Sequence, residues 1–273
     1  MQGTLSGRCA IVTGAGRGLG QEAACRLAAA GAEVALVSRT TEELNQTAAA
    51  ISQQQGTALA IAADVSTAAG IASVKAQVEA NFGTPTILVN AAGVFGPLQP
   101  IAASDPERWI ETLTINTVGP YRICQAFVDG MVSQGWGRVI NYSSAAAFHP
   151  PGPLVSAYAT SKVALNQLTR HLAAELEGTG VTANVLHPGD VKTSMWADIR
   201  REAEELGDEG EGYRSWVRWV DETGGDPPAK AADLVLRLTS DEAAAVSGQF
   251  LWIEDGLQAP IASWDAPEDA RPW

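Results

Sequence analysis

Residues 8–20 read Arg-Cys-Ala-Ile-Val-Thr-Gly-Ala-Gly-Arg-Gly-Leu-Gly, an apolar run that ends in glycines and leads into an alanine-rich segment. The apolar run predicts a buried strand over 8–13. The following pattern is helical from Leu19 to Ala30 and stops at Gly31, a typical helix C-terminal signal. Glycines often occupy such turns for steric reasons alone. Between a strand and a helix, however, they also let the backbone approach a pyrophosphate at the helix N-terminus, so this context favours nucleotide binding.

The rest of the chain repeats this alternation of strand and helix. Further strands are predicted at 32–38, 57–62, 86–90, 137–142, 181–186 and 248–253, and further helices at 42–54, 69–82, 106–131, 155–177 and 229–239. The strands are apolar throughout, which is typical of a parallel sheet covered by helices on both faces. We therefore predict an α/β fold with a doubly wound, seven-stranded parallel sheet. One domain is expected over 1–273, with an insertion at 194–228 and a C-terminal tail at 257–273.

Composition narrows the class of protein. A net charge of −13 argues against a nucleic-acid-binding surface and against docking on an anionic membrane. The N-terminus lacks the apolar run of a signal peptide, and no apolar stretch is long enough to span a bilayer. Cys9, Cys25 and Cys124 lie far apart within apolar segments, which indicates core residues and neither a disulfide framework nor a metal site. These features predict a cytoplasmic protein.

The segment Tyr158-Ala-Thr-Ser-Lys162 belongs to an amphipathic helix, because leucines follow at helical spacing. Residues four apart lie on the same helix face, so the phenol and the ammonium are expected to share one small volume. A neighbouring positive charge favours phenolate and is expected to lower the pKa of Tyr158. Such a tyrosine could exchange protons near neutral pH. By itself, the pair is also compatible with an ordinary solvated helix face.

Together, these features resemble the short-chain dehydrogenase/reductase family over about residues 5–256. The motifs that carry the resemblance, in order, are the turn from Thr13 to Gly20, Asp64-Val65, Asn90-Ala91-Ala92-Gly93, Asn116, Ser143-Ser144, Tyr158 with Lys162, and Pro188-Gly189 with Thr193. No single motif is specific, but the ordered set is hard to obtain otherwise. The resemblance implies a Rossmann-like sheet with a dinucleotide across its C-terminal edge, and a homo-oligomer, usually a tetramer or dimer built on the helices carrying Asn116 and Tyr158.

The resemblance also implies catalytic roles. Tyr158 would be the general acid in ketone reduction and the base in alcohol oxidation, while Lys162 would lower its pKa and bind the nicotinamide ribose. Ser144 would hold the substrate oxygen as charge grows on it. Asn116 would position a water that relays protons to Lys162. The cofactor would bring the hydride, and the protein would contribute orientation and a proton.

Two departures from the family pattern affect this assignment. The loop from Ser144 to Tyr158 is one residue longer than usual, and Ser143 is an adjacent rival. We prefer Ser144 and keep Ser143 open. His187 stands where the family often has a small polar residue, and a structural role at the strand end is favoured over catalysis. His149 is expected to line the loop over the site.

Cofactor choice can be argued from charge. A NAD-specific site of this type places a carboxylate at the end of the second strand, where this chain has Ser38-Arg39-Thr40 and no acidic residue before Glu42. Arg39 could bind a 2′-phosphate in a forked geometry, or it could merely stack on adenine. We predict NADP(H) in preference to NAD(H). The residues expected to contact the cofactor are Gly14, Arg17, Gly18, Leu19, Gly20, Ser38, Arg39, Thr40, Asp64, Val65, Asn90, Ala91, Gly93, Tyr158, Lys162, Pro188, Gly189, Val191 and Thr193.

The insertion lies where the family builds its substrate cover. Trp216, Trp219 and Val220 follow helical spacing, so they could form an apolar wall for the substrate or pack on the body of the protein. Acidic residues outnumber arginines in this segment, which disfavours anionic acyl carriers. We expect a bulky, neutral or cationic, partly aromatic ketone or secondary alcohol. The alternatives are a dehydratase or epimerase on the same scaffold, and a non-catalytic nucleotide-binding regulatory protein.

Overall fold

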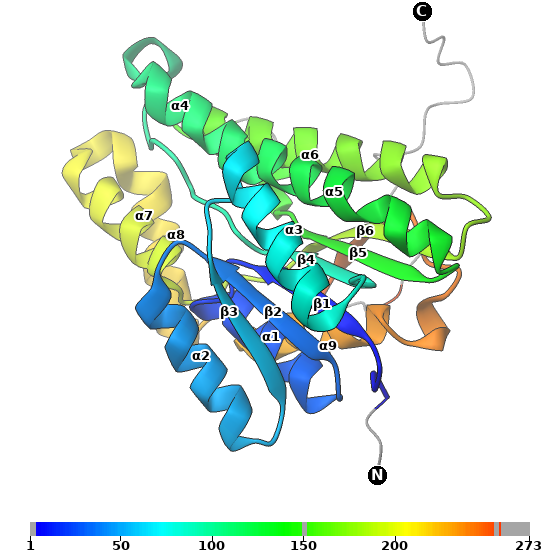
Figure 1. Ribbon diagram of the computed structural model, residues 1–273. Coiled ribbons are helices and arrows are strands. Elements are labelled where there is room, and N and C mark those ends of the chain that lie inside the picture. The colour runs from blue at the N-terminus through cyan, green and yellow to red at the C-terminus, as the bar shows by residue number, and fades with distance from the viewer. Residues whose placement is uncertain (1–3, 149–151, 254–256, 258–273) are drawn as a thin grey trace, which may run out of the picture.

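The computed structural model describes residues 4–148, 152–253 and 257. The seven predicted strands form one parallel sheet in the order β3-β2-β1-β4-β5-β6-β7 (Figure 1). The strands are β1 Cys9–Thr13, β2 Glu33–Ser38, β3 Thr57–Ala62, β4 Ile87–Asn90, β5 Gly137–Tyr142, β6 Val181–His187 and β7 Phe250–Trp252. Since β1 pairs with both β2 and β4, the strand order reverses beside β1. Ligands of doubly wound sheets bind at the carboxyl ends of the strands near such a switch point.

Helices cover both faces of the sheet, which explains why the strands are apolar throughout (Figure 1). Ala10 and Val12 face the core beneath α1 (Gly18–Ala29), α2 (Thr41–Gln53) and α9 (Pro228–Leu238). Cys9 and Ile11, which alternate with them along the chain, face the core beneath α3 (Ala68–Phe82), α5 (Gly119–Ser133) and α6 (Ser156–Glu175). All three cysteines are free, and Cys9 and Cys124 are buried. The predicted doubly wound α/β fold is confirmed.

The helical pattern predicted over 106–131 is interrupted. Asp105 caps α4 (Pro106–Leu113) by accepting a hydrogen bond from the Glu107 N–H, and α4 passes through a π-helical turn at Thr114–Val118 before α5 begins. Pro120 has no N–H, so it cannot provide the regular i→i−4 bond to the Asn116 carbonyl. This is the physical reason for the interruption. Such π turns are frequent at functional sites.

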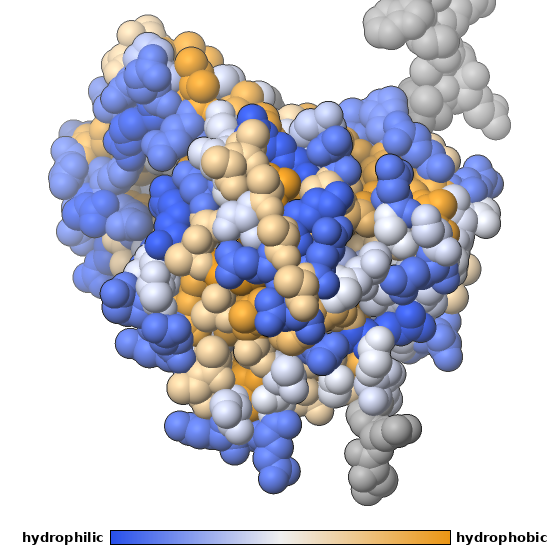
Figure 2. Space-filling view, viewed as in Figure 1, coloured by the Kyte–Doolittle hydropathy of each residue, from blue (hydrophilic) through white to orange (hydrophobic). Residues whose placement is uncertain are grey.

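The insertion folds into two helices, α7 (Ser194–Glu205) and α8 (Glu211–Thr223), joined by a short 3-10 turn at Gly207–Gly210. Glu202 of α7 contacts the body of the protein through an ion pair with Arg108 (3.0 Å) and by accepting a bond from the Leu98 N–H (3.2 Å). Asp221 of α8 pairs with Lys192 at 2.9 Å. Hydrophilic residues cover most of the outer surface around α7 (Figure 2). Within the described residues, no helix has the length and apolar character that crossing a membrane requires.

Candidate active site

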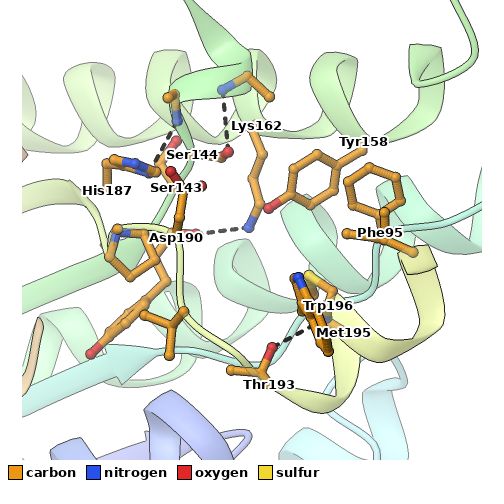
Figure 3. A pocket seen from close by; sticks show the side chains of 18 of the residues that line it. Phe95, Ser143, Ser144, Tyr158, Lys162, His187, Asp190, Thr193, Met195 and Trp196 are labelled. Carbon is orange, nitrogen blue, oxygen red and sulfur yellow. Dashed lines mark hydrogen bonds between the residues drawn. The ribbon is translucent and has the colours of Figure 1, made fainter. Parts of the chain in front are cut away.

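A cavity of about 290 Å³ lies at the carboxyl ends of β5 and β6, beneath α7 and α8. Tyr158, Lys162, Ser143 and Ser144 line it (Figure 3). The last residues of the two strands, Tyr142 and His187, line this cavity, and the loops that follow them form part of its wall. This cavity brings together four of the sequence-predicted residues, next to the carboxyl ends of the strands where doubly wound sheets bind ligands.

Helix α6 brings Tyr158 and Lys162 into the cavity, as their spacing of four residues predicts. The Lys162 ammonium lies 5.5 Å from the centroid of the Tyr158 ring and donates a 2.8 Å hydrogen bond to the Tyr142 carbonyl. The Tyr158 ring packs against Phe95 at a centroid distance of 4.7 Å. Both members of the pair are buried, at 9% and 5% exposure.

The expected net lowering of the pKa of Tyr158 is not found in the protein alone, where this pKa lies above its ordinary value. Burial raises the pKa of Tyr158 above its ordinary value, while a side-chain hydrogen bond with Ser144 acts in the opposite direction. Burial also lowers the pKa of Lys162 to about 8. The physical reason is desolvation, because a buried site disfavours the charged form of each group. Near neutral pH, the cavity therefore holds a protonated phenol beside an easily deprotonated ammonium.

The two candidate serines have different partners. The Ser143 hydroxyl donates a 2.5 Å hydrogen bond to Oδ1 of Asn166 and is almost fully buried. The Ser144 hydroxyl lies close enough to Tyr158 to oppose the rise of its pKa, and it accepts a 3.2 Å bond from the Ala146 N–H. Ser144 is thus the serine whose side chain reaches the tyrosine, although both residues line the cavity.

Asn116 lies in the π-helical turn, and both polar atoms of its side chain make hydrogen bonds. Its Nδ2 donates to the Val94 carbonyl (2.8 Å) and the Ser161 hydroxyl (3.0 Å), and its Oδ1 accepts from the Val94 N–H (2.9 Å). The Gly93 backbone lies close to both Asn116 and Lys162: a Cβ added there would be 3.2 Å from Asn116 Oδ1 and 3.8 Å from Lys162 Nζ. Asn116 therefore holds the loop after β4 beside Lys162. The proton-relaying water stays a prediction.

A second cavity, of about 230 Å³, extends from the first along the glycine turn and the ends of β2 and β3. Five residues line both cavities, which therefore adjoin each other: Leu19, Ala91, Gly93, Thr193 and Met195. Most of the predicted cofactor residues line the second cavity, namely Gly14, Arg17, Gly18, Leu19, Gly20, Ser38, Arg39, Thr40, Asp64, Val65, Ala91, Gly93 and Thr193. Tyr158, Lys162, Pro188, Gly189 and Val191 line the first.

Asn90 is the exception among these predicted residues. It is 2% exposed, lines neither cavity, and donates from Nδ2 to Oδ1 of Asn141 at 2.8 Å. Both residues stand at paired positions of β4 and β5. The side chain therefore holds two strands together, and a contact of Asn90 with the cofactor stays a prediction.

The glycine turn has the shape that a pyrophosphate needs. Gly14 has φ +67°, and a Cβ there would lie 2.8 Å from the Ala92 backbone nitrogen. A larger residue at this position would therefore clash with the backbone after β4. Arg17 at the start of α1 makes no side-chain cap, which leaves the first-turn N–H groups for a ligand. The residues present therefore fit a dinucleotide with its phosphates at this helix end.

Sequence reasoning missed Glu43, which enters the second cavity from the first turn of α2. It forms an ion pair with Arg17 (3.2 Å). Burial tends to raise the pKa of Asp64 on the opposite wall, but hydrogen bonds from Ser66 and the charge of Arg39 together lower it. Two arginines and two carboxylates thus surround the adenosine end. Glu43 faces the cavity because of its position around the axis of α2. Its distance along the sequence from Ser38 did not predict this orientation.

The aromatic wall of the first cavity also differs from the prediction. Trp216 faces the cavity and donates from Nε1 to Asp190 at 3.2 Å, but Trp219 is 49% exposed. The predicted stripe is thus split, because Val217 and Val220 take the buried face of α8. Phe95, Tyr213 and Trp196 complete the wall, and the first two were missed because they lie in separate segments.

His187 has the structural contact expected of it. Its Nδ1 accepts a 3.2 Å hydrogen bond from the Ala145 N–H, which fixes the loop carrying Ser144 to the end of β6. Its ring packs edge-on against Trp252. His149 lies outside the described residues. Within those residues, no group of three His, Cys, Asp or Glu side chains could hold a metal ion.

Comparison with known proteins gives consistent matches. The family model of short chain dehydrogenases matches residues 8–204. Galactitol 2-dehydrogenase (L-tagatose-forming) of Cereibacter sphaeroides is 35% identical over 92% of this chain and 95% of its own length. NAD+-bound xylitol dehydrogenase superposes with a TM-score of 0.82 at 25% identity, covering 92% of this chain and 98% of the other. A single-residue variant of actinorhodin polyketide ketoreductase with NADPH gives 0.83 at 29% identity, with 90% and 95% coverage.

Proposed function

The chain belongs to the short-chain dehydrogenase/reductase family, whose members are NAD(P)-dependent oxidoreductases of alcohols and ketones, and from this premise we propose that it is an NADP(H)-preferring ketoreductase for bulky, uncharged, partly aromatic substrates. The observation that carries the proposal is the buried Tyr158, with Ser144 and Lys162 beside it, in a cavity that adjoins a second cavity along the glycine turn. The matched relatives support oxidation and reduction at carbon–oxygen bonds.

In this mechanism, the bound nicotinamide supplies or accepts the hydride. Tyr158 donates its phenolic proton to the ketone oxygen during reduction and takes it back during alcohol oxidation. Its raised pKa keeps the donor protonated near neutral pH. Ser144 donates a hydrogen bond to the same oxygen as negative charge develops on it. Lys162, held by the Tyr142 carbonyl, binds the nicotinamide ribose and stabilises the phenolate left after proton transfer.

The two serines provide a matched test of this assignment. Replacing Ser144 by Ala removes the hydroxyl beside Tyr158, and kcat is expected to fall by about 10²–10³-fold. Replacing Ser143 by Ala leaves Asn166 without its buried donor, so this variant is expected to lose about 1–3 kcal/mol of stability and to keep most of its kcat. Steady-state kinetics and urea unfolding of both variants check this. The reverse pattern would assign the catalytic role to Ser143.

The preference for NADP(H) is supported by Arg39 at the adenosine end of the cradle, where the second arginine, Arg17, is paired with Glu43. Charge-assisted hydrogen bonds of this kind contribute about 1.5–3 kcal/mol each. Replacing Arg39 by Ala is therefore expected to raise the KM for NADPH by about 10–100-fold and to leave the KM for NADH within about threefold. Kinetics with both cofactors at matched concentrations check this. An equal rise in the KM for NADPH and the KM for NADH would mean that Arg39 stacks on adenine.

The substrate class is supported by the lining of the first cavity. Phe95, Tyr213, Trp196 and Trp216 provide aromatic surface, while the Asp190 carboxylate accepts from Trp216 and Lys162 donates to Tyr142. Buried charges without partners are costly, so a neutral substrate fits this wall better than an anionic one. The acidic residues of α7 and α8 would also repel anionic acyl carriers.

A panel of aryl ketones, assayed by NADPH oxidation with product identification, tests the proposed reaction. Stoichiometric alcohol formation is expected with the parent protein. Loss of water from a hydroxylated substrate without net NADPH consumption would indicate a dehydratase. Inversion of a stereocentre of the substrate without net NADPH consumption would indicate an epimerase. NADPH binding without turnover of any substrate would indicate a regulatory protein.

We also propose a homo-oligomer built on α4, α5 and α6. Ile110, Tyr121 and Val163, one on each of these helices, are about half exposed or more, at 55%, 51% and 50%. Large apolar side chains gathered on neighbouring helices are typical of subunit interfaces. Sedimentation analysis would distinguish a dimer or tetramer from a monomer.

A further inference from the structure

Glu43 lies in the first turn of α2 and lines the second cavity, beside the glycine turn. Its two carboxylate oxygens have different neighbours. Oε1 accepts a 3.2 Å hydrogen bond from Nη1 of Arg17, with which Glu43 forms an ion pair. Oε2 lies next to Gly16, where an added Cβ would be 3.0 Å from Oε2 and 3.1 Å from the Ser38 hydroxyl oxygen. The carboxylate therefore contacts the arginine of the turn and lies beside the end of β2.

The end of β2 is the part of a doubly wound sheet that distinguishes the two nicotinamide cofactors. A carboxylate there accepts a hydrogen bond from the 2′-hydroxyl of the adenosine ribose, whereas a nearby arginine accommodates a 2′-phosphate. In this chain Ser38 stands at the strand end and Arg39 follows it. The fold nevertheless brings the Glu43 carboxylate next to Ser38 from α2. Charges suited to both kinds of recognition thus lie in one cavity.

Contacts other than the ion pair hold α2 against the glycine turn. The hydroxyl of Thr47, which is fully buried one helical turn after Glu43, lies 3.1 Å from the Ala15 carbonyl oxygen and 3.3 Å from that of Gly16. The side chains of Arg17 and Glu43 are 64% and 30% exposed. Exposed ion pairs contribute little to stability, because water and salt screen them. A neutral residue at position 43 should therefore change the charge of the cavity and leave the fold intact.

The charges that line the second cavity balance one another. Arg17 and Arg39 carry the positive charges, and Glu43 and Asp64 carry the negative ones. A cofactor with a free 2′-hydroxyl adds no charge at the adenosine end and leaves the Arg17–Glu43 pair intact. A 2′-phosphate adds negative charge beside the Glu43 carboxylate and can bind Arg17 only in competition with it. Glu43 therefore opposes a 2′-phosphorylated cofactor more than an unphosphorylated one.

We propose that Glu43 is a specificity-determining residue that limits the preference for NADP(H): its carboxylate neutralises Arg17 and lies beside the position of the 2′-phosphate. This rests on the proposed function and makes its cofactor choice more specific. Arg39 and Glu43 then act in opposite directions on the same group of the cofactor. Replacing Arg39 weakens the binding of NADPH, whereas removing the charge of Glu43 strengthens it.

The test compares the binding of NADPH and NADH, which differ only in the 2′-phosphate, by fluorescence titration without substrate and at constant ionic strength. Glu43→Gln keeps the size of the side chain and removes its charge. The Kd of this variant for NADPH is expected to fall by about 3–10-fold, while its Kd for NADH stays within about twofold of the parent. Glu42→Gln is the matched control, because Glu42 lies in the same turn of α2, is exposed and lines neither cavity. Both Kd values of this control are expected to equal those of the parent.

Three results would overturn the inference. Glu43→Gln could leave the Kd for NADPH unchanged or raise it. It could lower the Kd for NADPH and the Kd for NADH equally, which would indicate an effect on the whole cofactor. Glu42→Gln could tighten NADPH binding as much, which would indicate an effect of net charge alone. If the parent bound neither cofactor, the proposed function would fail as well, and that outcome is distinct from unchanged Kd values in a protein that binds both.

Discussion

Replacing Tyr158 by Phe is expected to lower kcat for ketone reduction by about 10²–10⁴-fold, the usual contribution of a positioned proton donor. The phenol is the group that points into the cavity beside Ser144, and its ring packs on Phe95 in a manner that Phe can reproduce. The variant should therefore fold and bind NADPH normally. Stopped-flow measurement of a single turnover, with NADPH saturating, isolates the chemical step.

Tyr121→Phe is the matched control, because Tyr121 is 51% exposed on α5 and lines neither cavity. It removes the same hydroxyl at a distance from the site. Because Tyr121 also lies on the proposed subunit interface, sedimentation analysis first checks that this variant keeps the parental oligomeric state, and parental kcat is then expected. If Tyr158→Phe were as active as Tyr121→Phe, Tyr158 could not be the acid, and the mechanism would be wrong.

Replacing Lys162 by Met is expected to lower kcat/KM by about 10²-fold or more. The Lys162 ammonium lies 5.5 Å from the centroid of the Tyr158 ring. At about that separation, and at an effective dielectric constant of about 20, two unit charges attract by about 3 kcal/mol, which is about a hundredfold in rate. The loss of a ribose contact would add to this through the KM for the cofactor. At low pH, Lys162→Met should lower the rate of alcohol oxidation more than the rate of ketone reduction, because oxidation begins from the Tyr158 phenolate.

Lys162→Met also allows a test of stability against pH. Burial lowers the pKa of Lys162 to about 8 in the folded protein, from an ordinary value of 10.5 that the unfolded chain retains. Between these values the unfolded state binds more protons, so the free energy of unfolding rises with pH for the parent relative to the variant. From pH 8 to 9.5 the expected relative gain is about 1.6 kcal/mol, and well below pH 8 the cost of the buried charge is fully present. Urea unfolding of the cofactor-free proteins measures this difference, and a difference that does not change with pH would contradict it.

Much of the fold could be read from local sequence. The strands over 57–62 and 137–142 have the predicted bounds, and other elements shift by one to a few residues. The reason is that strands buried on both faces must be apolar runs, and the helices between them must show one apolar face and end at glycine or proline. The π-helical turn was not predicted, because Pro120 disrupts one hydrogen bond without breaking the apolar pattern.

Parts of the site were also encoded locally. The spacing of Tyr158 and Lys162 on one helix, and the glycine turn between β1 and α1, are short-range patterns with fixed geometric consequences. The pairing of Ser143 with Asn166 and of Asn90 with Asn141 depends on segments that meet only in the folded sheet. Local patterns do not contain that information.

By itself, then, the sequence determined the doubly wound sheet, the dinucleotide cradle and the presence of a Tyr–Lys pair on one helix face, because each follows from periodicity or from spacing along a single element. Only the tertiary structure decided that burial raises the pKa of Tyr158, that Ser144 is the serine whose hydroxyl opposes this rise, and that Phe95, Tyr213 and Trp196 meet around one cavity. Desolvation and the pairing of polar groups depend on every segment that surrounds an atom. Those segments come from distant parts of this chain.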